Sequence, residues 1–480
     1  MASFPHGVRI LELSDGLRPI QVVDSSIIGL IGTAPDAEAA VAASLTLGSG
    51  TAALTFTADT AGVAGNDITV RLRDPGAVSQ ALSVSITGKA ITVNLATDSS
   101  GVITSTAALI KTALDANATI AALVNVTSGG SGVVTAHPTT RLSGGLDEAF
   151  PVNTPFLVPG SQRIAARAGE TGTIPYALAD IFRQTGAAVV VVRAEVGEDD
   201  AETETNILAA IQKLLEAEAV LGVVPRILIA PEFSADKTVA DELISVADKL
   251  KAFVYADGPN TTDAEAIAYA GKFGSARLAV IDPWVVRNGV THAPSAAWAG
   301  ATAKSDNERG FWWSPSNIAV LGFDDTSRPV PFREGDTTSE ADLLNRGRVT
   351  TIINRAGRGM IFWGNLSTSS DPQFEFICVR RIADILNDSI KYGVRWASDR
   401  PINRTLLDDI AESVNAVISN LVNQGALYGG KCYPDPDFIT EAEIASGSLN
   451  FRLEFSPVYP AQTITFRSVL VGDYITEALL

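Results

Sequence analysis

The stretch between residues 365 and 433 constrains the fold most, because it contains two helices with definable ends. Asp371 can cap a helix whose first residue is Pro372, which lacks the N–H that would be unpaired there. Pro401 ends this helix, because proline cannot donate to the hydrogen-bond ladder. Its apolar residues at helical spacing are Ile377, Ile382, Ile385, Leu386, Ile390, Val394 and Trp396.

A second helix is predicted from Asn403 or Thr405 to Gly425, a residue suited to the left-handed position after a helix. Its apolar stripe consists of Leu406, Ile410, Val414, Val417, Ile418, Leu421 and Val422. Strand-like segments flank the pair at 360–363 and 464–471. Because each helix must bury its stripe against a sheet or its partner, we predict a compact α+β domain here.

The composition excludes several classes of protein. A chain of 480 residues predicts two to four domains, and a net charge of −18 argues against a nucleic-acid binder, which needs a basic face. The N-terminus lacks the basic and apolar regions of a signal peptide, and no run of 18 uncharged apolar residues predicts membrane insertion. Cys378 and Cys432 are expected to be free thiols, with a bond between them left as the alternative.

The first forty residues contain β-prone runs at 8–13 and 18–23, separated by the turn residues Ser14-Asp15-Gly16. The apolar run 25–35 then predicts a buried strand. Too few residues surround the first two runs to form a core, so they must pair with something distant. The residues by themselves favour a terminal strand that docks on its own domain.

Between residues 41 and 149 the composition shifts to Thr, Ser, Ala and Gly. This change predicts an inserted β-rich domain of ordinary small-domain size, placed on the outside of an assembly. Alternating runs predict strands at 53–58, 67–72, 81–86 and 90–95. A short helix is expected at 105–117 with Leu109, Ile110, Ala113 and Leu114 facing inward.

Residues 150–330 alternate continuous apolar strands with helical stretches, which is typical of a mostly parallel sheet covered on both faces. The expected strands are 187–194, 226–231, 252–257 and 276–282, and the expected helices are 201–219, 238–251 and 262–273. The predicted fold class is therefore a multidomain combination of α+β and α/β. By composition and pattern the chain divides into residues 1–40, the insert 41–149, the middle α/β domain 150–330, and a second core from residue 331 to 480. Within 331–480 we expect a short helix at 342–345 and a hairpin of 349–353 with 359–363.

No pattern predicts an enzyme or a cofactor site. No G-x-G-x-x-G follows any predicted strand, and G-x-S-x-G is absent. The nearest phosphate-loop match runs from Gly425 to Cys432, follows a helix and lacks the terminal Ser or Thr. His6, His137 and His292 fall in three separate regions without metal-ligand spacing. The enzyme hypothesis therefore has a fold and no site.

One region is basic within this acidic chain. Residues 346–404 contain ten basic and five acidic side chains, an excess of five positive charges. For any single arginine a solvated helix face with ordinary ion pairs is favoured. The alternative is a basic patch that docks an acidic partner and sets register more than affinity.

Several stretches resemble a known family. The run WGNLSTSSDPQFEFICVRRIADILNDSI (363–390) is similar to the sheath protein of contractile bacteriophage tails and R-type bacteriocins. Four further patches resemble the same family in its order: PHGVRILELSDGLRPI (5–20) with IIGLIGTAP, FRQTGAAVVVVR (182–193), PRILIAPEFS (225–234) and GFWWSPSN (310–317). The insert departs from the family pattern.

The resemblance implies a structural subunit and no enzyme. Six copies would form rings that stack helically around a tail tube and contract to drive the tube through the host envelope. Other implied partners are baseplate and tail terminator proteins; the subunit would assemble in the host cytoplasm and reside in the virion tail, binding no nucleic acid. The domain nearest the tube would be built from both termini, which here means residues 1–40 with 331–480.

The resemblance also assigns roles to residues. The intersubunit arm strands would contain Val8, Ile10, Leu11, Ile20, Val22, Ile464, Phe466, Val469 and Leu470. The tube-contact candidates are Arg380, Arg381, Lys391 and Arg395. The alternatives are a soluble α/β enzyme with a decorative β-domain, and a tail tube or baseplate component.

Overall fold

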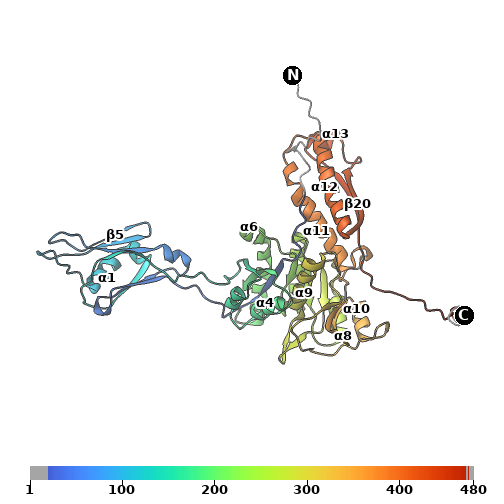
Figure 1. Cartoon of the computed structure of the whole chain (residues 1–480), viewed down its shortest axis with the longest axis horizontal. Coiled ribbons are helices and arrows are strands. Elements are labelled where there is room, and N and C mark those ends of the chain that lie inside the picture. Colours follow the sequence, from blue (N-terminus) through green and yellow to red (C-terminus); the bar gives the residue numbers. More distant parts are fainter. Residues whose placement is uncertain (1–19, 472–473, 475–480) are drawn as a thin grey trace, which may run out of the picture. The chain divides into compact units, whose positions relative to one another are not determined.

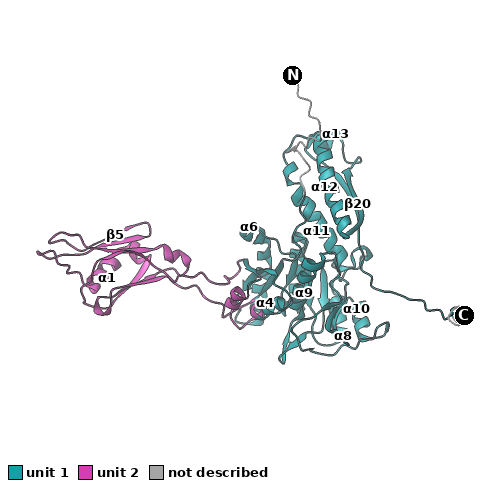
Figure 2. Ribbon diagram, viewed as in Figure 1, with its two compact units in different colours: residues 1–32, 155–161, 176–480 teal, residues 33–154, 162–175 magenta. Residues whose placement is uncertain are grey.

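The computed structural model describes residues 20–471 and 474 of the chain. These residues divide into two compact units, which are coloured separately in Figure 2. Of the described residues, unit 1 holds 20–32, 155–161, 176–471 and 474. Unit 2 holds residues 33–154 and 162–175. Val8, Ile10 and Leu11 of the predicted N-terminal arm lie outside the described residues.

Unit 1 is built on a nine-stranded, mostly parallel sheet, as predicted for the middle of the chain. Its strands, in spatial order, are β16 (Ile318–Ala319), β19 (Gly359–Trp363), β18 (Val349–Arg355), β13 (Leu278–Ile281), β12 (Phe253–Asp257), β11 (Ile227–Ile229), β1 (Ile28–Thr33), β10 (Ala188–Ala194) and β9 (Phe156–Pro159). The five central strands, β18, β13, β12, β11 and β1, run parallel. At one end of the sheet β19 pairs antiparallel with both β18 and β16, and at the other end β9 pairs antiparallel with β10. The expected hairpin of β18 and β19 extends this sheet across residue 331, where a domain boundary was expected.

Helices bury both faces of this sheet. Leu243 of α7 packs in one apolar cluster with Val254 of β12, while the next residue, Tyr255, stacks on Trp298 of α9 at 4.1 Å between ring centroids. The surrounding helices are α4 (Thr173–Gln184), α5 (Asp200–Lys213), α6 (Ala217–Leu221), α7 (Lys237–Leu250), α8 (Asp263–Ala270), α9 (Pro294–Arg309) and α10 (Glu340–Arg346). A small sheet of β14 (Val285–Arg287), β15 (Val290–His292) and β17 (Asp325–Thr326) completes this part. None of the described helices is long and apolar enough to cross a lipid bilayer.

The two predicted C-terminal helices are α11 (Ile377–Gly393) and α12 (Arg404–Gln424), seen in Figure 1. The ends of α12 are as predicted, since Asn403 accepts from the Leu406 N–H and Gly425 is left-handed at φ 84°. The predicted ends of the first helix were wrong. Asp371 caps only a single 3-10 turn, and Phe376 pairs with Leu366 in extended conformation, so α11 starts at Ile377. It ends at Gly393 and leaves Val394 and Trp396 beyond it.

The sheet beside these helices differs from the expected one. It is an antiparallel pair of β20 (Leu427–Pro434) and β21 (Phe451–Pro457), joined through the short helix α13 (Glu441–Ala445). The expected strand at 464–471 is absent from the described structure, where residues 458–471 have no regular secondary structure. A strand needs a ladder partner for its backbone groups, and this segment has none in its own described chain.

Unit 2 is a β-rich domain with two sheets. One contains β2 (Ser44–Leu47), β3 (Leu54–Ala58) and β7 (Val124–Ser128). The other contains β5 (Ser83–Thr87), β6 (Ala90–Asn94), β4 (Thr69–Arg73) and β8 (His137–Arg141). The helices α1 (Ala107–Asp115), α2 (Ala118–Ala121) and α3 (Gln162–Ala165) complete the unit. Ile110 and Leu114 of α1 are buried as predicted, but Leu109 is exposed, because it lies one residue outside the inward stripe.

The chain enters and leaves the two sheets of unit 2 through a paired neck. The N–H groups of Val41 and Leu146 each donate to the other residue's carbonyl, at 2.8 and 3.0 Å. Ser44 and Ser143 repeat this pairing one step further. An antiparallel pair of this kind holds its Cα atoms about 5.5 Å apart, a gap that a two-residue hairpin turn spans.

We therefore expect residues 42–145 to be removable when Val41 and Leu146 are joined through Asn-Gly. The shortened protein should stay soluble, with a melting temperature of unit 1 within about 3 °C of the parent. All six tryptophans lie at or beyond residue 284, so tryptophan fluorescence reports unit 1 alone. The same deletion closed without Asn-Gly is the control, because it breaks the neck pairing. An insoluble Asn-Gly variant would show that unit 1 depends on the excised residues.

Candidate assembly surfaces

An apolar cluster holds α11, α12 and the β20–β21 pair together. Ile382, Ile385 and Leu386 of α11 pack with Val414, Val417 and Leu421 of α12 and with Leu427 and Cys432 of β20. On β21, Phe451, Leu453 and Phe455 alternate toward the same cluster. Among the described residues this sheet has two strands, so both of its outer edges are without a strand partner.

The last part of the predicted N-terminal arm lies on its own subunit. Ile20 and Val22 pack against the α11–α12 cluster, and the Val23 N–H donates to Ser389 Oγ of α11 at 3.1 Å. The ideal Cβ position of Gly393 lies 2.2 Å from the side chain of Ile20, so any larger residue at 393 would displace this segment. In the single chain α11 covers the apolar side chains of Ile20 and Val22, and the assignment of residues 8–23 to an intersubunit arm stays a prediction.

The predicted C-terminal arm is exposed on its own subunit. Phe466 is 89% exposed, and Ile464, Val469 and Leu470 are also largely exposed. Four large apolar side chains in seven residues are unusual on the surface of an isolated subunit, and such exposure marks an interaction site.

Arg381 was predicted to lie on a basic surface, and the structure places it in the interior. Its side chain is 4% exposed, its guanidinium pairs with Asp306 of α9 and it donates to the carbonyl of Ser25 at 3.2 Å. Burial alone would lower the pKa of Arg381, but the Asp306 carboxylate outweighs it and raises this pKa. Arg381 therefore joins the N-terminal segment, α9 and α11 instead of facing a partner.

Two further carboxylates on the same side of α11 form ion pairs. Asp384 accepts from Arg277 and Arg380 at 3.0 and 3.1 Å, and Asp388 pairs with Arg226 next to β11. Residues 381, 384 and 388 follow helical spacing, so α11 has a charged buried stripe in addition to its apolar one. This stripe was not predicted from the sequence, where its signal is the helical spacing of Arg381, Asp384 and Asp388.

Only two of the four tube-contact candidates reach the surface. Arg380 is largely buried beside Asp384 and lies over the ring of Phe374 at 4.4 Å. Lys391 is exposed at the end of α11, and the Arg395 side chain is 59% exposed. Both flank Tyr392, with the Arg395 guanidinium 4.1 Å from the ring centroid. Arg395 also lies 3.5 Å from a Glu218 carboxylate oxygen.

The reactive residue types are enclosed or dispersed. Cys378 and Cys432 are free and buried, as expected, and burial raises the pKa of Cys378 to about 11. Buried His292 is 3.0 Å from Asp180, whereas His137 lies in β8 of unit 2. Among the described residues no three His, Cys, Asp or Glu side chains are grouped as metal ligands.

Two family models match consecutive parts of this chain. The phage tail sheath protein central domain matches residues 201–368, and the phage tail sheath C-terminal domain matches residues 369–470. The tail sheath protein of Escherichia phage P2 is 33% identical over 352 residues, which cover 69% of this chain and 88% of that protein. The chain belongs to the phage tail sheath protein family.

Two further relatives extend this result. The tail sheath protein of Burkholderia phage BcepMu is 29% identical across 99% of this chain and 98% of its own length. The helical sheath of the anti-feeding prophage in its contracted state has the same fold, with a TM-score of 0.54 and 24% identity over 66% of this chain and 88% of that one.

Membership fixes the broad function. The chain is a subunit of a contractile tail sheath and a component of the virion tail. The family is structural, which excludes the alternative of an α/β enzyme. The exposed C-terminal residues, the open edges of the β20–β21 sheet and the Lys391–Arg395 surface are therefore candidate assembly surfaces.

Proposed function

We propose that this sheath protein polymerises as stacked six-membered rings around a tail tube, and that contraction drives the tube through the host envelope. The observation that carries the proposal is that the described chain has both an exposed apolar segment and an open sheet edge. The segment is 464–471, and among the described residues neither outer edge of the β20–β21 sheet has a strand partner. An extended segment can add to a sheet edge through backbone hydrogen bonds, with alternate side chains giving specificity.

The arms connect copies without fixing their orientation. In this proposal, residue 464 onward forms the C-terminal arm, and the N-terminal arm precedes Ile20, because Ile20 is packed on α11. Copies joined through such arms can rotate without separating. The energy for contraction then comes from the difference in intersubunit contacts between an extended and a contracted state. The β20–β21 part lies nearest the tube, and unit 2 lies outward, where an insert is tolerated.

The first test is self-assembly of the purified protein. We expect negative-stain electron microscopy at rising concentration to reveal long, wide, hollow tubes without any other component. A single small oligomer at all concentrations would reject self-assembly as the basis of the sheath.

We assign contact with the tail tube to Lys391 and Arg395. Baseplate and terminator proteins are assigned to contacts with the two ends of the polymer. Two exposed cations beside the half-buried Tyr392 suit an acidic partner and set its register and rate of encounter.

The double substitution Lys391→Glu and Arg395→Glu should weaken assembly on the tube about tenfold at low salt, since like charges oppose docking. Self-assembled tubes of the pure protein should form as before. Assembly is measured by sedimentation with and without purified tube. Arg333→Glu is the matched control, because Arg333 is also exposed and lies outside the basic region. Unchanged assembly on the tube would reject this contact.

A further inference from the structure

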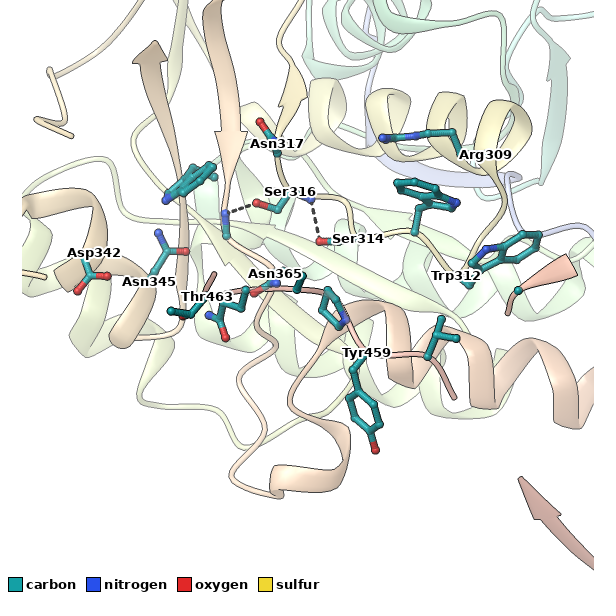
Figure 3. A pocket seen from close by; sticks show the side chains of 18 of the residues that line it. Arg309, Trp312, Ser314, Ser316, Asn317, Asp342, Asn345, Asn365, Tyr459 and Thr463 are labelled. Atoms are coloured by element: carbon teal, nitrogen blue, oxygen red, sulfur yellow. Dashed lines mark hydrogen bonds between the residues drawn. The ribbon is translucent and has the colours of Figure 1, made fainter. Parts of the chain in front are cut away.

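Unit 1 contains a groove of about 790 Å³ beside the root of the C-terminal segment (Figure 3). Its walls come from the loop 310–317, the helix α10, the end of β19 and the extended residues 458–463. Aromatic side chains line much of it, namely Trp312, Trp313, Trp363 and Tyr459. No residue of β20, β21 or 391–395 lines it.

The loop 310–317 is held in place by a hydrogen bond within the loop and by two that join it to residues 362 and 364. Ser316 N–H donates to Ser314 Oγ at 3.2 Å, and Gly364 N–H donates to Ser316 Oγ at 3.0 Å (Figure 3). Asn317 N–H donates to the Phe362 carbonyl of β19 at 2.7 Å. This wall of the groove is thus preformed, which lowers the ordering cost of binding a partner.

Exposed residues at the groove have the chemistry of an interface centre. Trp313 is 49% exposed and is the single tryptophan among the large exposed apolar residues that the structure describes. The Arg309 guanidinium lies 5.0 Å from its ring centroid, and Tyr459 is also exposed. Trp, Tyr and Arg are the residues that most often dominate binding energy between proteins.

The C-terminal wall has free backbone groups. Toward the C-terminus of the described chain, the last backbone hydrogen bond joins Val458 N–H to the Ala426 carbonyl at 3.3 Å. The described residues 459–471 make none. The wall continues directly into the exposed apolar residues 464–471. Backbone groups without partners beside an aromatic surface suit another polypeptide better than a small molecule.

We propose that this groove is a docking site for the body of a second copy of the chain, in addition to the exchange of arms. The proposal rests on the proposed self-assembly. The charged side chains that line the groove are one arginine, Arg309, and one aspartate, Asp342, so the lining lacks the net positive charge that an acidic tube would select. The groove borders residues 464–471, the proposed C-terminal arm. A second copy that binds this arm therefore lies close to the groove.

The first experiment measures polymerisation of the double variant Trp313→Ala and Tyr459→Ala. We expect its critical concentration to rise at least tenfold over the parent, because two central aromatic side chains are lost. Val290→Ala is the matched control, since Val290 is 59% exposed and lies outside the groove. A critical concentration within twofold of the parent would overturn the proposal while leaving self-assembly intact.

Chemical protection of the groove is a second measurement, made on a variant that keeps the aromatic side chains. Asn317→Cys places a thiol at the groove, and Cys378 and Cys432 are buried. Maleimide labelling of this thiol should be at least tenfold slower in polymer than in monomer, while Val102→Cys in unit 2 reacts equally in both. Equal labelling of Asn317→Cys in both states would overturn the proposal. So would protection that appears only when purified tube is added, since the occupant would then be the tube. Failure of the parent protein to polymerise would reject self-assembly itself, together with this site.

Discussion

Removal of residues 464–480 is expected to leave a folded monomer that does not polymerise. Ile464, Phe466, Val469 and Leu470 are largely exposed on their own subunit, so the free energy of unfolding should change by less than about 0.5 kcal/mol. In the polymer each of these side chains would gain roughly 1.5–3 kcal/mol on burial. Loss of even half of that total raises the critical concentration more than a hundredfold.

The measurement combines tryptophan fluorescence melting with sedimentation and electron microscopy. A length-preserving variant with serine at the same four positions separates the side chains from the backbone of the arm, and it should fail in the same way. Thr465→Ser with Arg467→Lys is the control, because these changes keep the apolar residues. Polymers of the truncated protein at the parental concentration would exclude the segment as an intersubunit arm.

The sequence predicts this fold well where the pattern is local. The strands β10 to β13 are continuous apolar runs, and their crossover helices have caps such as Asp236 and Thr262, so a mostly parallel sheet follows from the sequence alone. The position of α12 follows in the same way from Asn403 and Gly425. These elements depend on residues within one turn or one strand.

Long-range pairing is what the sequence does not reveal. The β20–β21 sheet was missed because Gly429, Gly430 and Pro434 weaken the strand pattern of β20, although Phe451, Leu453 and Phe455 alternate in β21. The burial of Arg381 depends on Asp306, which lies 75 residues away in the sequence. The cluster of positive charges therefore predicted a basic surface. In the fold, Arg381 is instead neutralised by the Asp306 carboxylate of α9.

The substitution Asp306→Ala is expected to have the largest effect on stability. It leaves the Arg381 guanidinium buried without its carboxylate and also removes the acceptor of the Ser25 hydroxyl, at 2.8 Å. Breaking one side of a buried ion pair costs about 3–5 kcal/mol. The urea midpoint of unit 1, followed by tryptophan fluorescence, should fall accordingly. Asp408→Ala is the control, since it removes the carboxylate beside the 94% exposed Arg404 and should cost less than about 0.5 kcal/mol.

The double variant Asp306→Ala with Arg381→Met decides whether the buried charge causes the loss. Methionine keeps much of the apolar volume of arginine without its charge, so the double variant should be more stable than Asp306→Ala alone. A double variant with the summed cost of both single changes would mean that the two residues act independently. Because Arg381 ties the segment at Ser25 to α11, the same loss should also loosen Ile20 and Val22 from α11. The ion pair would then set where the N-terminal arm begins, which joins the stability of the subunit to the geometry of the polymer.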